Sequence, residues 1–91
     1  MQASEPAVHH DRQNNRFEVH IDSYIGELTY FLNRDTITFT HTGVPPAIEG
    51  RGIGSLLVKT GLQYARENNL KVRSLCWFVR KYIDRHPESV S

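Results

Sequence analysis

The chain has 91 residues, of which 38% are hydrophobic, so it can form one small folded domain but is too short for two. Its single cysteine, Cys76, excludes an internal disulfide bond. Nothing near the start of the sequence resembles a signal peptide or a membrane span, and we therefore expect a cytoplasmic protein with no membrane partner.

The formal net charge of +1 conceals an uneven distribution along the chain. Residues 1–45 carry three Arg against six acidic residues, a balance of −3, whereas residues 46–91 carry eight Lys or Arg against four acidic residues, a balance of +4. The positive second half favours an anionic ligand there. Ordinary solvated surface charge explains the same distribution without any ligand.

Residues 1–15 have almost no apolar content, and we expect them to form a flexible N-terminal tail that precedes a folded domain at residues 16–88. His9 and His10 fall within this tail. The other histidines lack supporting cysteine or carboxylate residues at the spacing of a metal site, so we expect no metal.

Alternating apolar and polar residues predict three consecutive antiparallel strands, at residues 16–21, 26–32 and 36–44. Residues 33–35 read as the hairpin turn between the second and third of these. Because side chains alternate along a strand, the third should place Ile37, Phe39 and His41 on one face and its threonines on the other.

Apolar residues at helical spacing predict a helix at residues 53–68, in which Gly61 permits close packing on the sheet and Asn68-Asn69 can supply a left-handed cap. A short strand at residues 71–76 then lies parallel to the third strand, and a second helix covers residues 77–86. The predicted fold is an α/β (α+β) domain. It has a mixed sheet of about four strands, three antiparallel and a parallel fourth, with two helices.

The strand-to-helix turn Gly50-Arg51-Gly52-Ile53-Gly54-Ser55 is the most informative motif. Glycine permits positive φ and close approach to a ligand, and the free N–H groups at a helix start attract phosphate. The turn lacks the Gly-Lys-Ser/Thr ending of a nucleoside-triphosphate loop, and it has Ser55 where a dinucleotide fingerprint needs Gly or Ala. Close packing of the helix start remains a purely structural explanation.

In this context the segment Glu49-Gly50-Arg51-Gly52-Ile53-Gly54 resembles the Arg/Gln-x-x-Gly-x-Gly/Ala signature of the GNAT superfamily of acetyltransferases. The likeness to minimal, single-domain GNAT-like proteins runs from about residue 17 to residue 88. It also rests on His41-Thr42-Gly43-Val44-Pro45-Pro46, Cys76-Trp77-Phe78-Val79, Tyr82-Ile83 and His86-Pro87-Glu88. The departure is Glu49, where the superfamily usually has Arg or Gln, and Arg51 is the candidate to supply the local positive charge.

The resemblance implies an N-acetyltransferase that binds acetyl-coenzyme A, with the pyrophosphate on the N–H groups of residues 50–54 and the pantetheine between the third and fourth strands. Ligands of such sheets bind outside the carboxyl ends of the strands, which supports the same placement. The implied cofactor-binding residues are Val44, Gly50, Arg51, Gly52, Ile53, Gly54, Ser55, Cys76, Phe78 and Tyr82.

His41 and Cys76 are the candidate catalytic residues, because both lie near the carboxyl ends of strands expected to be neighbours about 4.8 Å apart. The imidazole could take the proton of an amine. The thiol, at the start of the second helix, could accept the acetyl group or return a proton to coenzyme A, and Tyr82 is a rival proton donor. Buried structural roles explain His41 and Cys76 equally well, and core packing explains Phe78 and Tyr82.

The leading hypothesis is therefore acetyl transfer to an amine of a protein or small molecule, by a monomer or weak homodimer. The alternative is a coenzyme A or acyl-coenzyme A binding module without useful catalysis, because the sequence stops without the closing strands of larger relatives. Nucleic-acid binding through basic residues around Trp77 and Phe78 is a third reading, against which the small net charge and the lack of a known motif argue.

Overall fold

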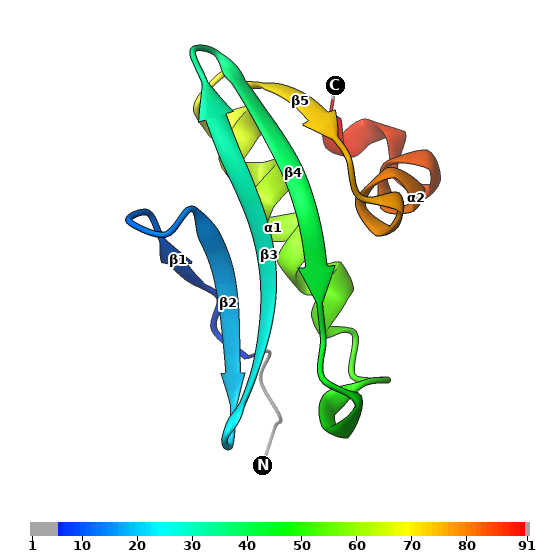
Figure 1. Ribbon diagram of the computed structural model, residues 1–91. Coiled ribbons are helices and arrows are strands. Elements are labelled where there is room, and N and C mark those ends of the chain that lie inside the picture. The colour runs from blue at the N-terminus through cyan, green and yellow to red at the C-terminus, as the bar shows by residue number, and fades with distance from the viewer. Residues whose placement is uncertain (1–5, 91) are drawn as a thin grey trace.

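The computed structural model describes residues 6–90, which form one sheet with two helices (Figure 1). The strands are β1 (His9–Asp11), β2 (Arg16–Ile21), β3 (Tyr24–Asn33), β4 (Thr36–Gly43) and β5 (Lys71–Ser74). The helices are α1 (Ile53–Glu67) and α2 (Trp77–Arg85), and short 3₁₀ segments occupy Pro46–Ile48 and Pro87–Val90. Within residues 6–90, no helix has the length and apolar character needed to cross a membrane.

The strands lie in the order β1-β2-β3-β4-β5. The first four are antiparallel to their neighbours, and β5 pairs in parallel with β4 after the crossover through α1. This confirms the mixed α+β sheet, the strand-helix-strand crossover and the two helices predicted from the sequence. The sheet has five strands where about four were predicted, and β1 is the additional one.

Strand β1 lies inside the stretch for which we expected a flexible tail, and for residues 9–11 that expectation is wrong. His10 is opposite Phe17 of β2, and their rings stack at 4.1 Å. The His10 Nε2 atom is also 2.5 Å from the Tyr30 hydroxyl oxygen. The inward-facing side chain of β1 is thus an imidazole, which a search for apolar alternation does not detect. Residues 1–5 of the expected tail lie outside the described residues.

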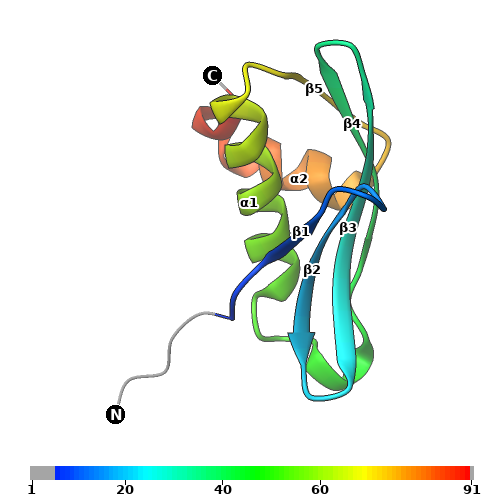
Figure 2. The same ribbon diagram turned by 90° about the vertical axis from the view of Figure 1, so that its left-hand side faces the viewer.

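The core lies between one face of the sheet and helix α1, which Figure 2 shows covering that face. Gly61 of α1 faces the sheet, where an added Cβ would be 2.9 Å from Phe39 Cε1 and 3.0 Å from Leu28 Cδ2. This confirms the close packing predicted at Gly61. The buried apolar side chains of the helix and of the sheet are Ile53, Leu57, Val58, Leu62, Ala65, Phe17, Val19, Leu28, Ile37 and Phe39.

A β-bulge interrupts the pairing of β3 with β4. Tyr30 is opposite Phe39, but the preceding Thr29 is opposite His41, so Thr40 is an extra residue on β4. One extra residue reverses the alternation of side chains beyond it. His41 therefore shares the open face with Thr29, and the expectation that it lies on the face of Phe39 is wrong. Thr42, which is opposite Leu28, takes the helix-covered face instead.

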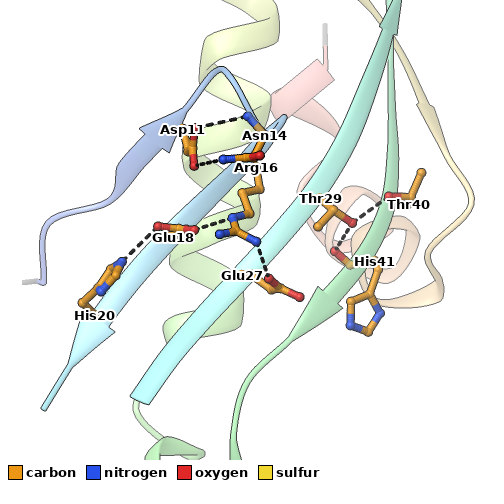
Figure 3. A network of polar contacts seen from close by, with 9 residues as sticks. All are labelled: Asp11, Asn14, Arg16, Glu18, His20, Glu27, Thr29, Thr40 and His41. Carbon is orange, nitrogen blue, oxygen red and sulfur yellow. Dashed lines mark hydrogen bonds and ion pairs between the residues drawn. The ribbon is translucent and has the colours of Figure 1, made fainter. Parts of the chain in front are cut away.

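The open face of the sheet carries a row of polar contacts next to His41 (Figure 3). The Arg16 guanidinium pairs with the Glu18 carboxylate and lies 3.7 Å from Glu27. The His20 Nε2 atom is 2.9 Å from Glu18, and this contact is the largest cause of a lowered pKa at the buried Glu18 carboxyl. Two of the six acidic residues of residues 1–45 thus share the Arg16 guanidinium on this face.

Replacing Gly61 by alanine should destabilise the protein. Overpacking a buried contact typically costs about 1–3 kcal/mol, whereas the better helix propensity of alanine returns about 1 kcal/mol. The net result expected for Gly61→Ala is a lower free energy of unfolding, measured by urea denaturation, with Gln63→Ala on the exposed side of α1 as control. A stability gain in Gly61→Ala would contradict the close contact with Phe39.

His10 should make the fold sensitive to acid. Burial, followed by the charges of Arg12 and His9, lowers the pKa of His10. Since the unfolded chain then binds the proton more readily, this contribution to stability is present above the ordinary histidine pKa and is lost as the pH falls below it. We expect the free energy of unfolding to fall less steeply between pH 7.5 and pH 5 in His10→Phe than in the wild type. Equal slopes would show that burial at this position does not disfavour the protonated ring.

Candidate functional site

Strands β4 and β5 separate halfway along β4. Residues 36–39 pair with residues 71–74, and the last backbone hydrogen bond runs from Leu75 N–H to the Phe39 carbonyl at 2.9 Å. Beyond this hydrogen bond, β4 continues to Gly43, while the segment that follows β5 enters α2, as Figure 1 shows. A cavity of about 520 Å³ opens between them, the β4–β5 cavity, and its lining residues are Thr40, His41, Thr42, Val44, Glu49, Gly54, Leu75, Cys76, Trp77 and Phe78.

Cys76 is the buried nucleophilic group of this cavity. It stands immediately before α2, and Ser74 Oγ holds its backbone by accepting from its N–H at 3.1 Å and donating to its carbonyl at 2.8 Å. Burial raises the pKa of the Cys76 thiol. Hydrogen bonds from the Thr42 hydroxyl and from the backbone N–H groups of Val79, Phe78 and Thr42 together lower it by more, so the net shift of the pKa is downward. The Thr42 hydroxyl oxygen is 3.5 Å from Sγ. The site therefore favours a thiolate.

His41 reaches the same cavity from the opposite face of the sheet. An added Cβ on Gly43 would be 3.0 Å from the His41 Nε2 atom, so the imidazole lies over the backbone of Gly43. The structure thus brings His41 and Cys76 to one cavity, although the bulge leaves the imidazole exposed and not packed in the core. A general base needs such access to an incoming proton donor.

The glycine turn serves two physical needs at different positions. Gly50 has φ 80° and Gly52 has φ 74°, and an added Cβ at either would meet no atom within 4 Å, so their backbone conformation is what requires glycine. At Gly54 the need is space, because a Cβ would lie 2.8 Å from Phe78 Cζ. The explanation by backbone freedom and the explanation by close packing are therefore both correct, and the packing partner is Phe78.

The first turn of α1 presents free N–H groups to solvent. No side chain caps Gly52, and the first turn of the helix contains no acidic residue. A hollow of about 250 Å³, the glycine hollow, lies here and is lined by Val44, Glu49, Gly50, Gly52, Ile53, Gly54, Ser55 and Phe78. It lies next to the β4–β5 cavity, and Val44, Glu49, Gly54 and Phe78 line both.

A smaller hollow of about 80 Å³, the basic hollow, lies next to the glycine hollow and is lined mostly by residues of α2. It shares Ser55 and Phe78 with the glycine hollow, and its remaining lining residues are Lys81, Tyr82, Arg85 and His86. Tyr82 lines this hollow and not the cavity of Cys76, so the structure does not bring the rival proton donor to the thiol. Arg51 is exposed and lines none of the three hollows.

Sequence reasoning missed several residues of the β4–β5 cavity. Thr42, which contacts the thiol, was expected on the other face because nothing in the sequence signals the bulge. Leu75 and Trp77 are 66% and 72% exposed at the cavity's edge, and their position beside Cys76 was the only signal for them. Within residues 6–90, no group of three or more His, Cys, Asp or Glu side chains is arranged to hold a metal ion.

The comparisons with known proteins agree with this architecture. Residues 16–91 match the family model described as GCN5-related N-acetyl-transferase. The chain belongs to the GCN5-related N-acetyltransferase family. It is 34% identical to Protein NATD1 of Mus musculus over 83 residues, covering 88% of this chain and 76% of the relative. Protein NATD1 of Homo sapiens is 32% identical, with 88% and 74% covered.

A solved structure within the GCN5-related family has the same fold. The solution structure of a GCN5-like putative N-acetyltransferase from Staphylococcus aureus superposes with a TM-score of 0.71 at 30% identity, covering 96% of this chain and 86% of that one. The match extends over nearly all of the sheet and both helices. It confirms the GNAT resemblance recognised in the glycine turn.

The hydroxyl of Thr42 should tune the reactivity of Cys76. Removing a hydrogen bond of about 1 kcal/mol to the thiolate raises the thiol pKa and slows alkylation near neutral pH by about fivefold. We expect this slowing by iodoacetamide in Thr42→Val, with a pH–rate profile displaced to higher pH. Thr40→Val is the control, because Thr40 Oγ1 contacts Thr29 Oγ1, at 2.7 Å. Equal rates in the two variants would contradict the assigned contact.

Proposed function

We propose that this protein binds acetyl-coenzyme A along the glycine hollow and the β4–β5 cavity and transfers the acetyl group to an amine. One observation supports the proposal: the hollow at the uncapped start of α1 lies next to the cavity of Cys76, with four residues lining both. A diphosphate held by the N–H groups of the first helical turn would direct a thioester arm toward Cys76. Family membership supports the same substrate class.

The binding half of the proposal rests on the backbone of the turn. The φ values of Gly50 and Gly52 turn this loop around the start of α1, where the helix dipole adds positive potential. Glu49 lines both hollows, and its carboxylate opposes an anion there. The backbone N–H groups and the basic second half of the chain must offset this repulsion, so affinity should decline with added salt.

The chemical half of the proposal assigns separate tasks to the two candidate catalytic residues. The exposed His41 imidazole accepts a proton from the acceptor amine, which then forms a bond to the thioester carbonyl carbon as the carbon–sulfur bond breaks. In the direct route the Cys76 thiol returns a proton to the departing coenzyme A thiolate. In the other route the Cys76 thiolate attacks the thioester carbonyl carbon and coenzyme A leaves as its thiolate. The amine then attacks the acetyl-cysteine, which releases Cys76 as the thiolate, and His41 takes the amine proton. The lowered thiol pKa favours the second route.

A binding module without catalysis is the second candidate, because one observation favours it. The bulge at Thr40 places His41 on the open face, whereas Thr42 and Cys76 occupy the helix-covered face. Because the sheet lies between the His41 imidazole and the Cys76 thiol, His41 can accept a proton only from an amine that approaches from the open face. Binding without turnover on a broad panel of amines would favour the module.

The test combines calorimetry, an amine-acetylation assay and intact-mass analysis. We expect acetyl-coenzyme A to bind to the wild type, to His41→Gln and to Cys76→Ala, while His41→Gln lowers the rate of acetyl transfer by about a hundredfold. An acetyl adduct that disappears in Cys76→Ala supports the acyl-cysteine route. His20→Gln, on the same face but paired with Glu18, is the matched control.

Absence of binding to the wild-type chain would overturn the proposal as a whole. Transfer that survives unchanged in His41→Gln would remove that residue from the mechanism. Transfer that survives in Cys76→Ala without an acetyl adduct on the wild type would leave only the direct route, with the proton supplied from elsewhere.

A further inference from the structure

The basic hollow is the last of three adjoining hollows. The cavity of Cys76 shares four lining residues with the glycine hollow, which shares Ser55 and Phe78 with the basic hollow, so the three adjoin in that order. This order matches the order of chemical groups in coenzyme A: thiol and pantetheine, then diphosphate, then an adenosine that carries a 3′-phosphate. The inference below rests on the proposed function, because it assigns the end of the same ligand.

Lys81 and Arg85 are the two cations that line this hollow. Lys81 and Arg85 are four residues apart on α2, which places them on the same side of the helix. Neither forms an ion pair with any residue among residues 6–90, and the Lys81 ammonium lies 6.0 Å from the Trp77 ring centroid. Like charges at this spacing repel one another, and an anion placed between them would relieve that repulsion.

Neutral donors complete the hollow. The Ser55 side chain at the start of α1 and the Tyr82 side chain on α2 both line it. Burial and then the nearby Glu88 carboxylate raise the pKa of the Tyr82 hydroxyl, which keeps it protonated and able to donate a hydrogen bond. Glu88 lies beyond the lining, where its carboxylate is 3.5 Å from the His86 Nδ1 atom.

The size of the hollow restricts its occupant. A volume of about 80 Å³ holds only two or three water molecules, at about 30 Å³ for each. Such a space can hold a phosphate group, whereas a purine ring would extend beyond it. We propose that the basic hollow binds the 3′-phosphate of the coenzyme A adenosine, with Lys81 and Arg85 as the specificity-determining cations.

The experiment compares coenzyme A with 3′-dephospho-coenzyme A by titration calorimetry of the full chain. We expect the wild type to prefer coenzyme A by about tenfold, which corresponds to about 1.4 kcal/mol. Lys81→Ala and Arg85→Ala should each reduce this preference to about threefold or less, while their affinity for 3′-dephospho-coenzyme A stays unchanged. Lys59→Ala is the control, because Lys59 is an exposed cation of α1 outside the basic hollow.

The outcomes separate the two proposals. Equal affinity of the wild type for both ligands overturns the 3′-phosphate assignment and leaves the proposed function standing. A preference that persists undiminished in both variants also overturns it. Failure of the wild type to bind either ligand overturns the proposed function, and the assignment of the basic hollow with it. A preference that shrinks with rising salt in the wild type, but not in Lys81→Ala, supports the charge contact.

Discussion

The separation of β4 from β5 after Phe39 is the constraint on which the rest of the site depends. A parallel pair that continued to the end of β4 would satisfy its backbone groups within the sheet and leave no space beside Cys76. Two local devices keep the strands apart: the chain turns into α2 directly after Cys76, and the bulge at Thr40 changes the direction of β4 side chains. The cavity is thus a consequence of backbone geometry and not of small side chains.

The chemistry of the site divides along the same line. On the covered side, Thr42 and the start of α2 stabilise a thiolate in a buried position. On the open side, His41 lies over Gly43, beside a network in which Arg16 compensates the neighbouring carboxylates. A ligand in the cavity would therefore meet a nucleophile from one face and a base from the other. Membership of the GCN5-related N-acetyltransferase family supports the acetyl transfer that we propose for this arrangement.

Much of the fold was predictable because it follows from hydrophobic periodicity and from turn chemistry. The strands of residues 16–44, both helices and the left-handed Asn69 all appear where the pattern predicted them. Strand β1 was missed because its inward-facing side chain is the half-buried His10, whose ring packs as an aromatic group although the residue counts as polar. The predicted face of His41 was wrong because the unpaired residue Thr40 reverses the alternation of side chains along β4. Nothing distinguishes Thr40 from the neighbouring threonines in the sequence.

The Phe78 ring is a wall common to the cavity and both smaller hollows, and it rests on the bare backbone of Gly54. The three compartments therefore cannot vary independently during evolution. A larger residue at position 54 demands a smaller one at position 78, and that exchange would merge neighbouring compartments into one trough. Growth of the side chain at position 54 is therefore restricted to paired replacements, whereas a smaller side chain at position 78 can be accepted alone.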